Sequence, residues 1–283
     1  MTPETYHGIR TVLAQIIKGT VWENHVYLVG GCVRDEMMGE KIHDIDIAVD
    51  VVNGGIRFVQ WLKSRNLVAR GRSVQIFEHF GTAKVRLRQY PKEVIDCVQT
   101  RKDKYVYEEE PHPEQNFGTI EEDAMRRDLT INSLFVNVST GELLDPTGLG
   151  MQDIQNHVIR TPNDPDETFT DNPMHVLRCI RFAVRYGWRI DSGLLDKLKS
   201  NVGILAEATP TRITKEVMSI LKLKRKKRAF RLIEVIGATK YVDPVVKLIQ
   251  QGGVKSDKPH HKRYDKSRKK NNRREKEKGT AIS

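Results

Sequence analysis

The first half of the chain alternates short apolar runs with amphipathic stretches, which predicts a β-sheet flanked by helices. Residues 3–19 and 53–65 repeat apolar positions every three or four residues, as helices that cover a sheet do. The strand-like runs are short, apolar or alternating, and separated by turn residues. They are 26–29, 44–49, 67–69, 74–77, 81–87, 94–98, 135–138 and 142–144, the last two forming a hairpin.

The second half shows a helical pattern, so a separate helical domain is expected after a boundary near residue 147. In its most informative segment, 173–186, the apolar side chains share one side of a helix. The opposite side carries His175, Arg178, Arg181 and Arg185. Further amphipathic helices are expected at 190–202 and 211–223. We therefore predict an α+β protein with a sheet-containing domain at 1–147, an all-α domain at 148–250 and a tail at 251–283.

Positive charge is concentrated towards the C-terminal end. The net charge of the 283 residues is +11, yet 255–278 alone hold 12 Lys and Arg against 4 Asp and Glu. Low complexity with this charge predicts a disordered basic tail. Such a tail favours a polyanionic partner, most simply RNA, and the basic segment 222–231 is expected to face it too. The alternative is a tail that only keeps the protein in solution.

Cysteine usage and hydropathy set the expected compartment. Cys32, Cys97 and Cys179 are far apart and odd in number, which predicts a reducing cytoplasm and neither a disulfide framework nor a zinc site. The chain has no apolar run of about 18 residues and no signal-peptide pattern at its start. We expect a soluble cytoplasmic protein without membrane association and without an obligate protein partner.

The stretch from 26 to 50 carries the candidate chemistry. A buried strand leads into Gly30 and Gly31, a helical segment with Arg34 follows, and Asp44 and Asp46 come next. Alternate strand residues point to one face, so these two carboxylates lie side by side. Mg²⁺ binds carboxylate oxygens, water and phosphates, glycines let an anion approach the backbone, and arginine forks bind phosphate. Singly, an edge-strand Asp pair or a Gly-Gly turn is ordinary; in this order they predict a phosphate-plus-metal site.

The string GGCVRDEMMGEKIHDIDIAVD resembles the signature of class II tRNA nucleotidyltransferases and bacterial poly(A) polymerases, within the polymerase-beta-like nucleotidyltransferase superfamily. The resemblance implies a head domain with a mixed sheet, a helical neck, and two magnesium ions on Asp44 and Asp46. It also implies that Gly31 and Arg34 contact a nucleoside triphosphate. A third acidic group is implied on a neighbouring strand, and Asp96 is our candidate because a charge in an apolar run needs a partner. The alternative for Asp96 is an edge-strand residue facing water.

Residues 121–134, EEDAMRRDLTINSL, resemble the second signature of the family. Arg126 and Arg127 beside Asp128 predict an ion-paired cluster that presents fixed guanidinium groups. The resemblance implies that Arg127, Asp128 and Asn132 contact triphosphate and ribose; a salt-bridged helix end is the structural alternative. The polar residues 101–120 before them predict a loop.

Residues 171–182, DNPMHVLRCIRF, lie where the family carries Glu-Asp-x-x-Arg and two further arginines. In the family, that Asp and Arg read the base edge of the incoming nucleotide. The matching positions here hold Asp171, Asn172 and His175, and Arg178 and Arg181 match the later arginines. Asn can donate as well as accept and His is shorter than Arg, so the choice between CTP and ATP stays open. A basic helix face in water is the alternative.

We therefore predict that an RNA 3′-hydroxyl attacks the α-phosphate of ATP or CTP and that pyrophosphate leaves. Asp44, Asp46 and Asp96 would be the catalytic residues with two magnesium ions. The nucleotide-binding residues would be Gly30, Gly31, Arg34, Arg127, Asp128, Asn132, Asn172, His175, Arg178 and Arg181. The first interpretation is addition of CCA, or part of it, to tRNA. A poly(A) polymerase and a catalytically weakened RNA-binding relative are alternatives. An oxidoreductase is disfavoured, because no GxGxxG follows the first strand.

Overall fold

The structure is a computed structural model that describes residues 1–102 and 117–251. Residue contacts divide the chain into one compact unit, Met1–Val245, and a second, Val246–Ser283. Nearly all of the predicted tail and most of the predicted loop at 101–120 lie outside the described residues. The boundary near residue 147 stays a prediction.

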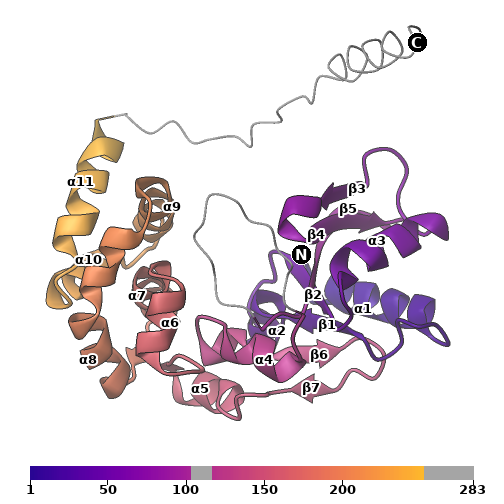
Figure 1. The fold of residues 1–283 in the computed structure, drawn as a ribbon, viewed down its shortest axis with the longest axis horizontal. Coiled ribbons are helices and arrows are strands. Elements are labelled where there is room, and N and C mark those ends of the chain that lie inside the picture. The colour runs from indigo at the N-terminus through magenta and orange to yellow at the C-terminus, as the bar shows by residue number, and fades with distance from the viewer. Residues whose placement is uncertain (103–116, 252–283) are drawn as a thin grey trace, which may run out of the picture. The chain divides into compact units, whose positions relative to one another are not determined.

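A seven-stranded mixed sheet organises the first half of the described chain (Figure 1). Its strand order is β3-β4-β5-β2-β1-β6-β7. β2 and β5 run parallel, and the other neighbours run antiparallel. The strands are β1 (Val26–Val29), β2 (Ile45–Val49), β3 (Val74–Phe77), β4 (Thr82–Leu87), β5 (Tyr90–Gln99), β6 (Phe135–Asn137) and β7 (Leu143–Leu144). The predicted strand at 67–69 is wrong in extent, because only an isolated bridge joins Val68 to Leu87.

Helices pack on this sheet through the apolar stripes that the sequence predicted. The helix α1 (Pro3–Ile17) buries Tyr6, Ile9, Leu13 and Ile17. The helix α3 (Gly54–Ser64) lies on β2, β4 and β5. Gly55 permits this close packing, since a Cβ there would lie 2.5 Å from the Cys97 carbonyl oxygen. Short elements complete the domain: α2 (Gly31–Met37), the 3-10 turns η1 (Glu78–Phe80) and η2 (Thr130–Asn132), and α4 (Ile120–Met125).

The described part of the second half is built around α7 (Met174–Tyr186), which packs against α6, α9 and α10 (Figure 1). Its apolar side, including Val176, Leu177 and Ile180, is buried as predicted. A two-residue parallel pair, β8 (Val158–Ile159) with β9 (Arg189–Ile190), is the exception to the predicted all-α character. The remaining elements are α5 (Gly150–Asn156), α6 (Pro165–Asp171), α8 (Ser192–Ser200), η3 (Val202–Glu207), α9 (Pro210–Leu221), α10 (Lys226–Val235) and α11 (Thr239–Gln250).

The cysteines and the lengths of the helices bear on two further expectations. Cys32, Cys97 and Cys179 are buried free thiols. Within residues 1–102 and 117–251, every helix falls short of the length and apolarity that crossing a bilayer requires.

Candidate active site

Three aspartates, Asp44, Asp46 and Asp96, form the acidic cluster at the centre of the sheet. Asp46 on β2 stands directly opposite Asp96 on β5 in the parallel register, and Asp44 precedes β2 by one residue. Ile45 and Ile47, which alternate with them, are completely buried, whereas Asp44 is exposed and Asp46 half-buried. The predicted arrangement is confirmed in this respect: the apolar side chains enter the core and the carboxylates stay accessible.

Electrostatics within the acidic cluster disfavours a fully ionised state. Burial, with the neighbouring Asp96 and Asp44 carboxylates, raises the pKa of Asp46 to about 6, while Arg127 and Lys84 act in the opposite direction. Carboxylates that raise one another's pKa in this way are stabilised by a cation between them. A cation held between these carboxylates would favour their ionised form.

The oxygen ligands of the acidic cluster suit a magnesium ion that keeps water and substrate in its shell, and they do not form a site closed by protein ligands alone. Among residues 1–102 and 117–251, no group of three or more His, Cys, Asp or Glu side chains is already assembled to hold a metal ion. Mg²⁺ is ordinarily bound by one or two carboxylates, with water and substrate phosphates completing its shell. Accessible carboxylates without further protein ligands are the arrangement such an ion uses.

The turn between β1 and α2 brings the backbone close to an arginine. Gly30 has φ +73°, which L side chains rarely adopt, and a Cβ at this position would lie 3.2 Å from Nη1 of Arg127. Gly30 therefore permits both the turn and the approach of Arg127. Since Arg127 also acts on the charge of Asp46, the glycine turn and the acidic cluster share one neighbourhood.

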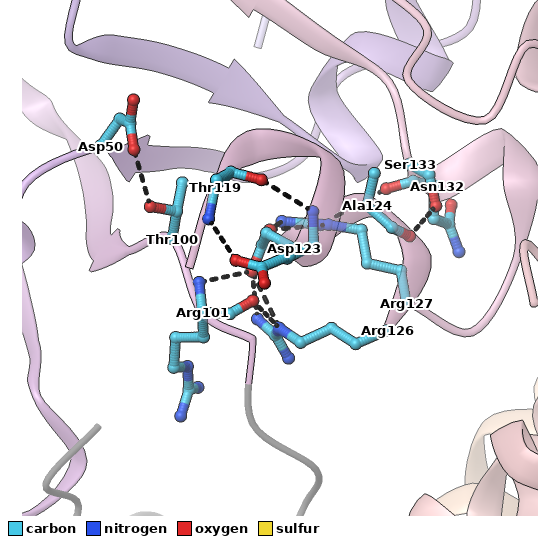
Figure 2. A network of polar contacts seen from close by, with 11 residues as sticks. Asp50, Thr100, Arg101, Thr119, Asp123, Ala124, Arg126, Arg127, Asn132 and Ser133 are labelled. Carbon is cyan, nitrogen blue, oxygen red and sulfur yellow. Dashed lines mark hydrogen bonds and ion pairs between the residues drawn. The ribbon is translucent and has the colours of Figure 1, made fainter. Parts of the chain in front are cut away.

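Arg126 and Arg127 are held by Asp123, and the predicted ion pair with Asp128 is wrong. Arg127 donates from Nη2 to Asp123 Oδ2 at 2.6 Å, and Arg126 donates from Nη2 to Oδ1 at 2.5 Å (Figure 2). Asp123 is 1% exposed and also accepts from the Arg101 backbone N–H. Although burial opposes ionisation, the two guanidinium groups hold the pKa of Asp123 below its ordinary value. The spacing of three and four residues from Asp123 is the helical signal that sequence reasoning missed.

Asp128 instead pairs with an arginine fifty residues away. It accepts from Nε and Nη2 of Arg178 at 2.7 and 2.5 Å, and from the side chain of Asn132 at 2.9 Å. Burial acts against its ionisation, but the charges of Arg178 and His175 and the hydrogen bonds from Arg178 and Asn132 together hold the pKa of Asp128 well below the usual range. The sheet-bearing domain and α7 are thus joined by a charge-assisted pair in which the carboxylate is buried and the guanidinium is partly exposed.

Asn132 connects these groups. Its side-chain oxygen accepts from Arg34, its side-chain nitrogen donates to Asp128, and its backbone oxygen accepts from Arg127 at 3.3 Å. Arg34 is 4% exposed and also donates to Asp35 at 2.6 and 2.8 Å. Arg34, Arg127, Asp128, Asn132 and Arg178 therefore form one continuous network.

Aromatic rings on α7 complete this network. Phe182 lies beneath three guanidinium groups, those of Arg34, Arg178 and Arg181, at 5.2, 5.5 and 4.5 Å from the ring centre. Arg181 also pairs with Glu216 on α9. Sequence reasoning missed Phe182 and Glu216, because a Phe in an amphipathic helix and a Glu on a different helix carry no local signal.

The predicted base-reading positions lie where α6 ends and α7 begins: Asp171 is the last residue of α6, Asn172 follows it, and His175 is the second residue of α7. Asn172 accepts from Arg212 Nη2 at 2.9 Å and from the Met174 backbone at 3.1 Å, and its amide nitrogen lies 3.2 Å from His175 Nε2. The other ring nitrogen of His175 lies 3.2 Å from the Thr168 carbonyl oxygen, to which it can only donate. Burial lowers the pKa of His175. In the neutral ring that donates from one nitrogen to Thr168, the other nitrogen, Nε2, accepts from the Asn172 amide. Asp128 and Arg178 also act on this ring, so it adjoins the network.

A mixed sheet with paired aspartates beside a glycine turn and fixed arginines defines a nucleotidyltransferase-type head domain. Residues 26–160 match the family described as the poly A polymerase head domain. These residues therefore resemble that family's head domain, and the resemblance in the motifs is confirmed.

Relatives and a solved structure agree with this assignment. The mitochondrial CCA tRNA nucleotidyltransferase of Saccharomyces cerevisiae is 35% identical over 210 residues, with 69% of this chain and 38% of that enzyme covered. Poly(A) polymerase I of Salmonella typhi is 31% identical over 207 residues, with 69% and 42% covered. A solved tRNA nucleotidyltransferase, complexed with a primer tRNA and an incoming ATP analogue, matches with a TM-score of 0.66 at 27% identity, covering 81% of this chain and 62% of that one. The chain spans less than half the length of either curated relative.

Proposed function

We propose that this protein transfers nucleotides from CTP and ATP to the 3′ end of tRNA. The observation that carries the proposal is the acidic cluster, in which Asp46 and Asp96 are register partners and Arg127 acts on Asp46. The named activities of the yeast relative and of the solved tRNA complex support the same reaction. The proposal includes the cytoplasmic location expected from the free cysteines. The yeast relative is named as a mitochondrial enzyme, and recovery of this protein in the mitochondrial fraction of its cells would overturn the cytoplasmic location.

Magnesium would be held by Asp44 and Asp46, with Asp96 beside them. When bound, such ions supply charge stabilisation at the attacking and leaving oxygens of an in-line displacement. The chain itself supplies the positive charge for the triphosphate. Arg127 is oriented for this by Asp123, which engages one side of its guanidinium and leaves the side chain 18% exposed.

Arg34 and Arg178 play a different part in the proposed mechanism. Arg34 is almost fully buried, and it donates hydrogen bonds to Asp35 and Asn132. It therefore fixes the position of Asn132, whose backbone oxygen accepts a hydrogen bond from Arg127. Arg178 fixes Asp128. Preorganised charge of this kind lowers the barrier because no reorganisation is needed when negative charge develops.

The experiment that tests the proposal is a nucleotide-omission assay on tRNA lacking its 3′ CCA. With CTP alone, we expect addition of C residues only; with CTP and ATP, we expect a single A to follow. Absence of incorporation with Mg²⁺ or Mn²⁺ would overturn the proposal in favour of a catalytically weakened RNA-binding relative.

A poly(A) polymerase is the second candidate. It is favoured by the 31% identity to a poly(A) polymerase. The altered base-reading positions, where Asn172 accepts from Arg212, leave the choice between CTP and ATP open. Long extension with ATP alone, on RNA without a tRNA body, would establish it in place of CCA addition.

A further inference from the structure

Lys84 lies in line with the acidic cluster, although the mechanism above gives it no role. On three adjacent strands, Lys84 of β4 opposes Asp96 of β5, which opposes Asp46 of β2. Register partners on neighbouring strands lie on the same face of a sheet. The residues on either side of Lys84, Ala83 and Val85, are buried, so Lys84 shares the accessible face with the carboxylates.

The ammonium group of Lys84 engages both oxygens of the Asp96 carboxylate. Nζ lies 2.7 Å from Oδ1 and 2.9 Å from Oδ2. These are the atoms that Asp96 would offer to a divalent cation. The ammonium therefore occupies the place of a cation on this carboxylate.

The pair is poorly suited to a purely structural role. The side chains of Lys84 and Asp96 are 43% and 34% exposed, and exposed ion pairs contribute little to folding because water and salt screen them. The lysine stem is flexible and its head is strongly hydrated, so Lys84 can leave Asp96 and enter water at small cost.

Resting on the function proposed above, we propose that Lys84 is a counter-cation of Asp96 that a divalent metal ion must displace. Lys84 would thereby set the metal concentration that the site requires. The bare carboxylates repel one another, and Lys84 relieves part of this repulsion when metal is scarce. A metal ion that binds Asp96 must break the Lys84 pair. Removing Lys84 therefore tightens metal binding.

The test is a Mn²⁺ titration of the full chain, with free Mn²⁺ measured by its electron paramagnetic resonance signal at fixed ionic strength. Lys84→Met keeps the length of the side chain and removes its charge. We expect its Kd for Mn²⁺ to fall about fivefold, which corresponds to about 1 kcal/mol, the upper range for an exposed ion pair. Lys84→Arg retains the charge and should bind Mn²⁺ like the wild type.

Lys92→Met is the matched control for the loss of one positive charge. Lys92 is exposed and lies on the same strand as Asp96, four residues earlier. At about 3.3 Å per residue this is roughly 13 Å away, beyond the screening length at physiological salt. Its Mn²⁺ affinity should equal that of the wild type. In an Asp96→Asn background, Lys84→Met should no longer change the affinity, because its partner is gone.

The outcomes separate the two proposals. If the wild type binds Mn²⁺ and Lys84→Met binds it equally well, the counter-cation role is overturned and the proposed function stands. A gain in affinity that is equally large in Lys92→Met or persists without Asp96 also overturns it. If neither protein binds Mn²⁺, the metal assignment of the proposed function falls as well. Thermal unfolding of each variant checks that it is folded.

Discussion

Replacing Arg178 should destabilise the protein more than replacing its partner Asp128. Arg178 contributes two charge-assisted hydrogen bonds to Asp128 Oδ2, at 2.7 and 2.5 Å. The carboxylate is 6% exposed, whereas the Arg178 side chain is 33% exposed. Arg178→Met therefore leaves a buried charge without its main partner, while Asp128→Asn leaves a guanidinium that water can reach.

The structure gives a scale for both substitutions. Breaking a buried ion pair costs about 3–5 kcal/mol, and we take the lower end, about 3 kcal/mol, because Asn132 and the Leu129 N–H still donate to Oδ1 of Asp128. Asp128→Asn should cost about 1.5 kcal/mol, the value of a hydrogen bond to a charged group. The double variant should cost less than the sum of the two, since neither charge is left behind.

Arg185→Met is the matched control. Arg185 is on the same helix and is also 33% exposed, but it lies 3.8 Å from Asp35. Asp35 keeps its hydrogen bonds from Arg34 and Tyr186. The expected cost is below about 1 kcal/mol, as for exposed pairs.

Urea unfolding at pH 7 and at lower pH measures these differences. The folded-state pKa of Asp128 lies below its ordinary value, so its stabilising contribution is present above about pH 4, the ordinary Asp range, and is lost as pH falls through the folded-state pKa. In Arg178→Met, burial raises the pKa of Asp128, so the deficit relative to wild type should shrink below about pH 4. A cost under 1 kcal/mol for Arg178→Met, or a larger cost for Asp128→Asn, would refute this reasoning.

Three further predictions address the glycine turn, the acidic cluster and the tail. Gly30→Ala should lower stability by about 2 kcal/mol, because a side chain is strained at φ +73° and would approach Arg127. Gly39→Ala shares the backbone strain at φ +65° but has open space around it, so it should cost less in the same thermal melt. Without divalent cations, Asp46→Asn should stabilise the protein by about 1–2 kcal/mol at pH 8 and not below pH 4, because the pKa of Asp46 is raised to about 6 by burial and by Asp96. Equal stability of the variant and the wild type at pH 8 would contradict the mutual repulsion of the carboxylates. Deleting 252–283, which holds the basic run 255–278, should weaken RNA binding in a filter assay and flatten its salt dependence; unchanged affinity would assign RNA binding to other residues.

Local patterns in the sequence predicted the parts of the site that lie within one element. The alternation around Asp44 and Asp46 correctly placed Ile45 and Ile47 in the core, because strand geometry fixes which face each residue takes. The amphipathic pattern of 173–186 likewise predicted the buried side of α7. Both predictions depend on a repeat of two or of 3.6 residues within one element and on no residue elsewhere in the sequence.

Pairings between elements were beyond the same reasoning. Asp96 could be placed in a strand from its local pattern. Its parallel pairing with Asp46 could not, because the two residues are fifty positions apart in the sequence. Arg178 and Asp128 are separated by the same distance in sequence. The arginines of α7 were expected to need an external anion, yet Arg178, Arg181 and Arg185 each face a carboxylate of this chain. A charge pattern indicates that a partner is needed and does not say where the partner lies.

The acidic cluster is tested most directly by single-turnover incorporation of labelled CTP into tRNA lacking CCA, with RNA binding measured in parallel. Asp44→Ala and Asp46→Ala should abolish incorporation and leave the affinity for tRNA nearly unchanged. Incorporation by either variant at a rate close to that of the wild type would contradict the assignment of these carboxylates to catalysis.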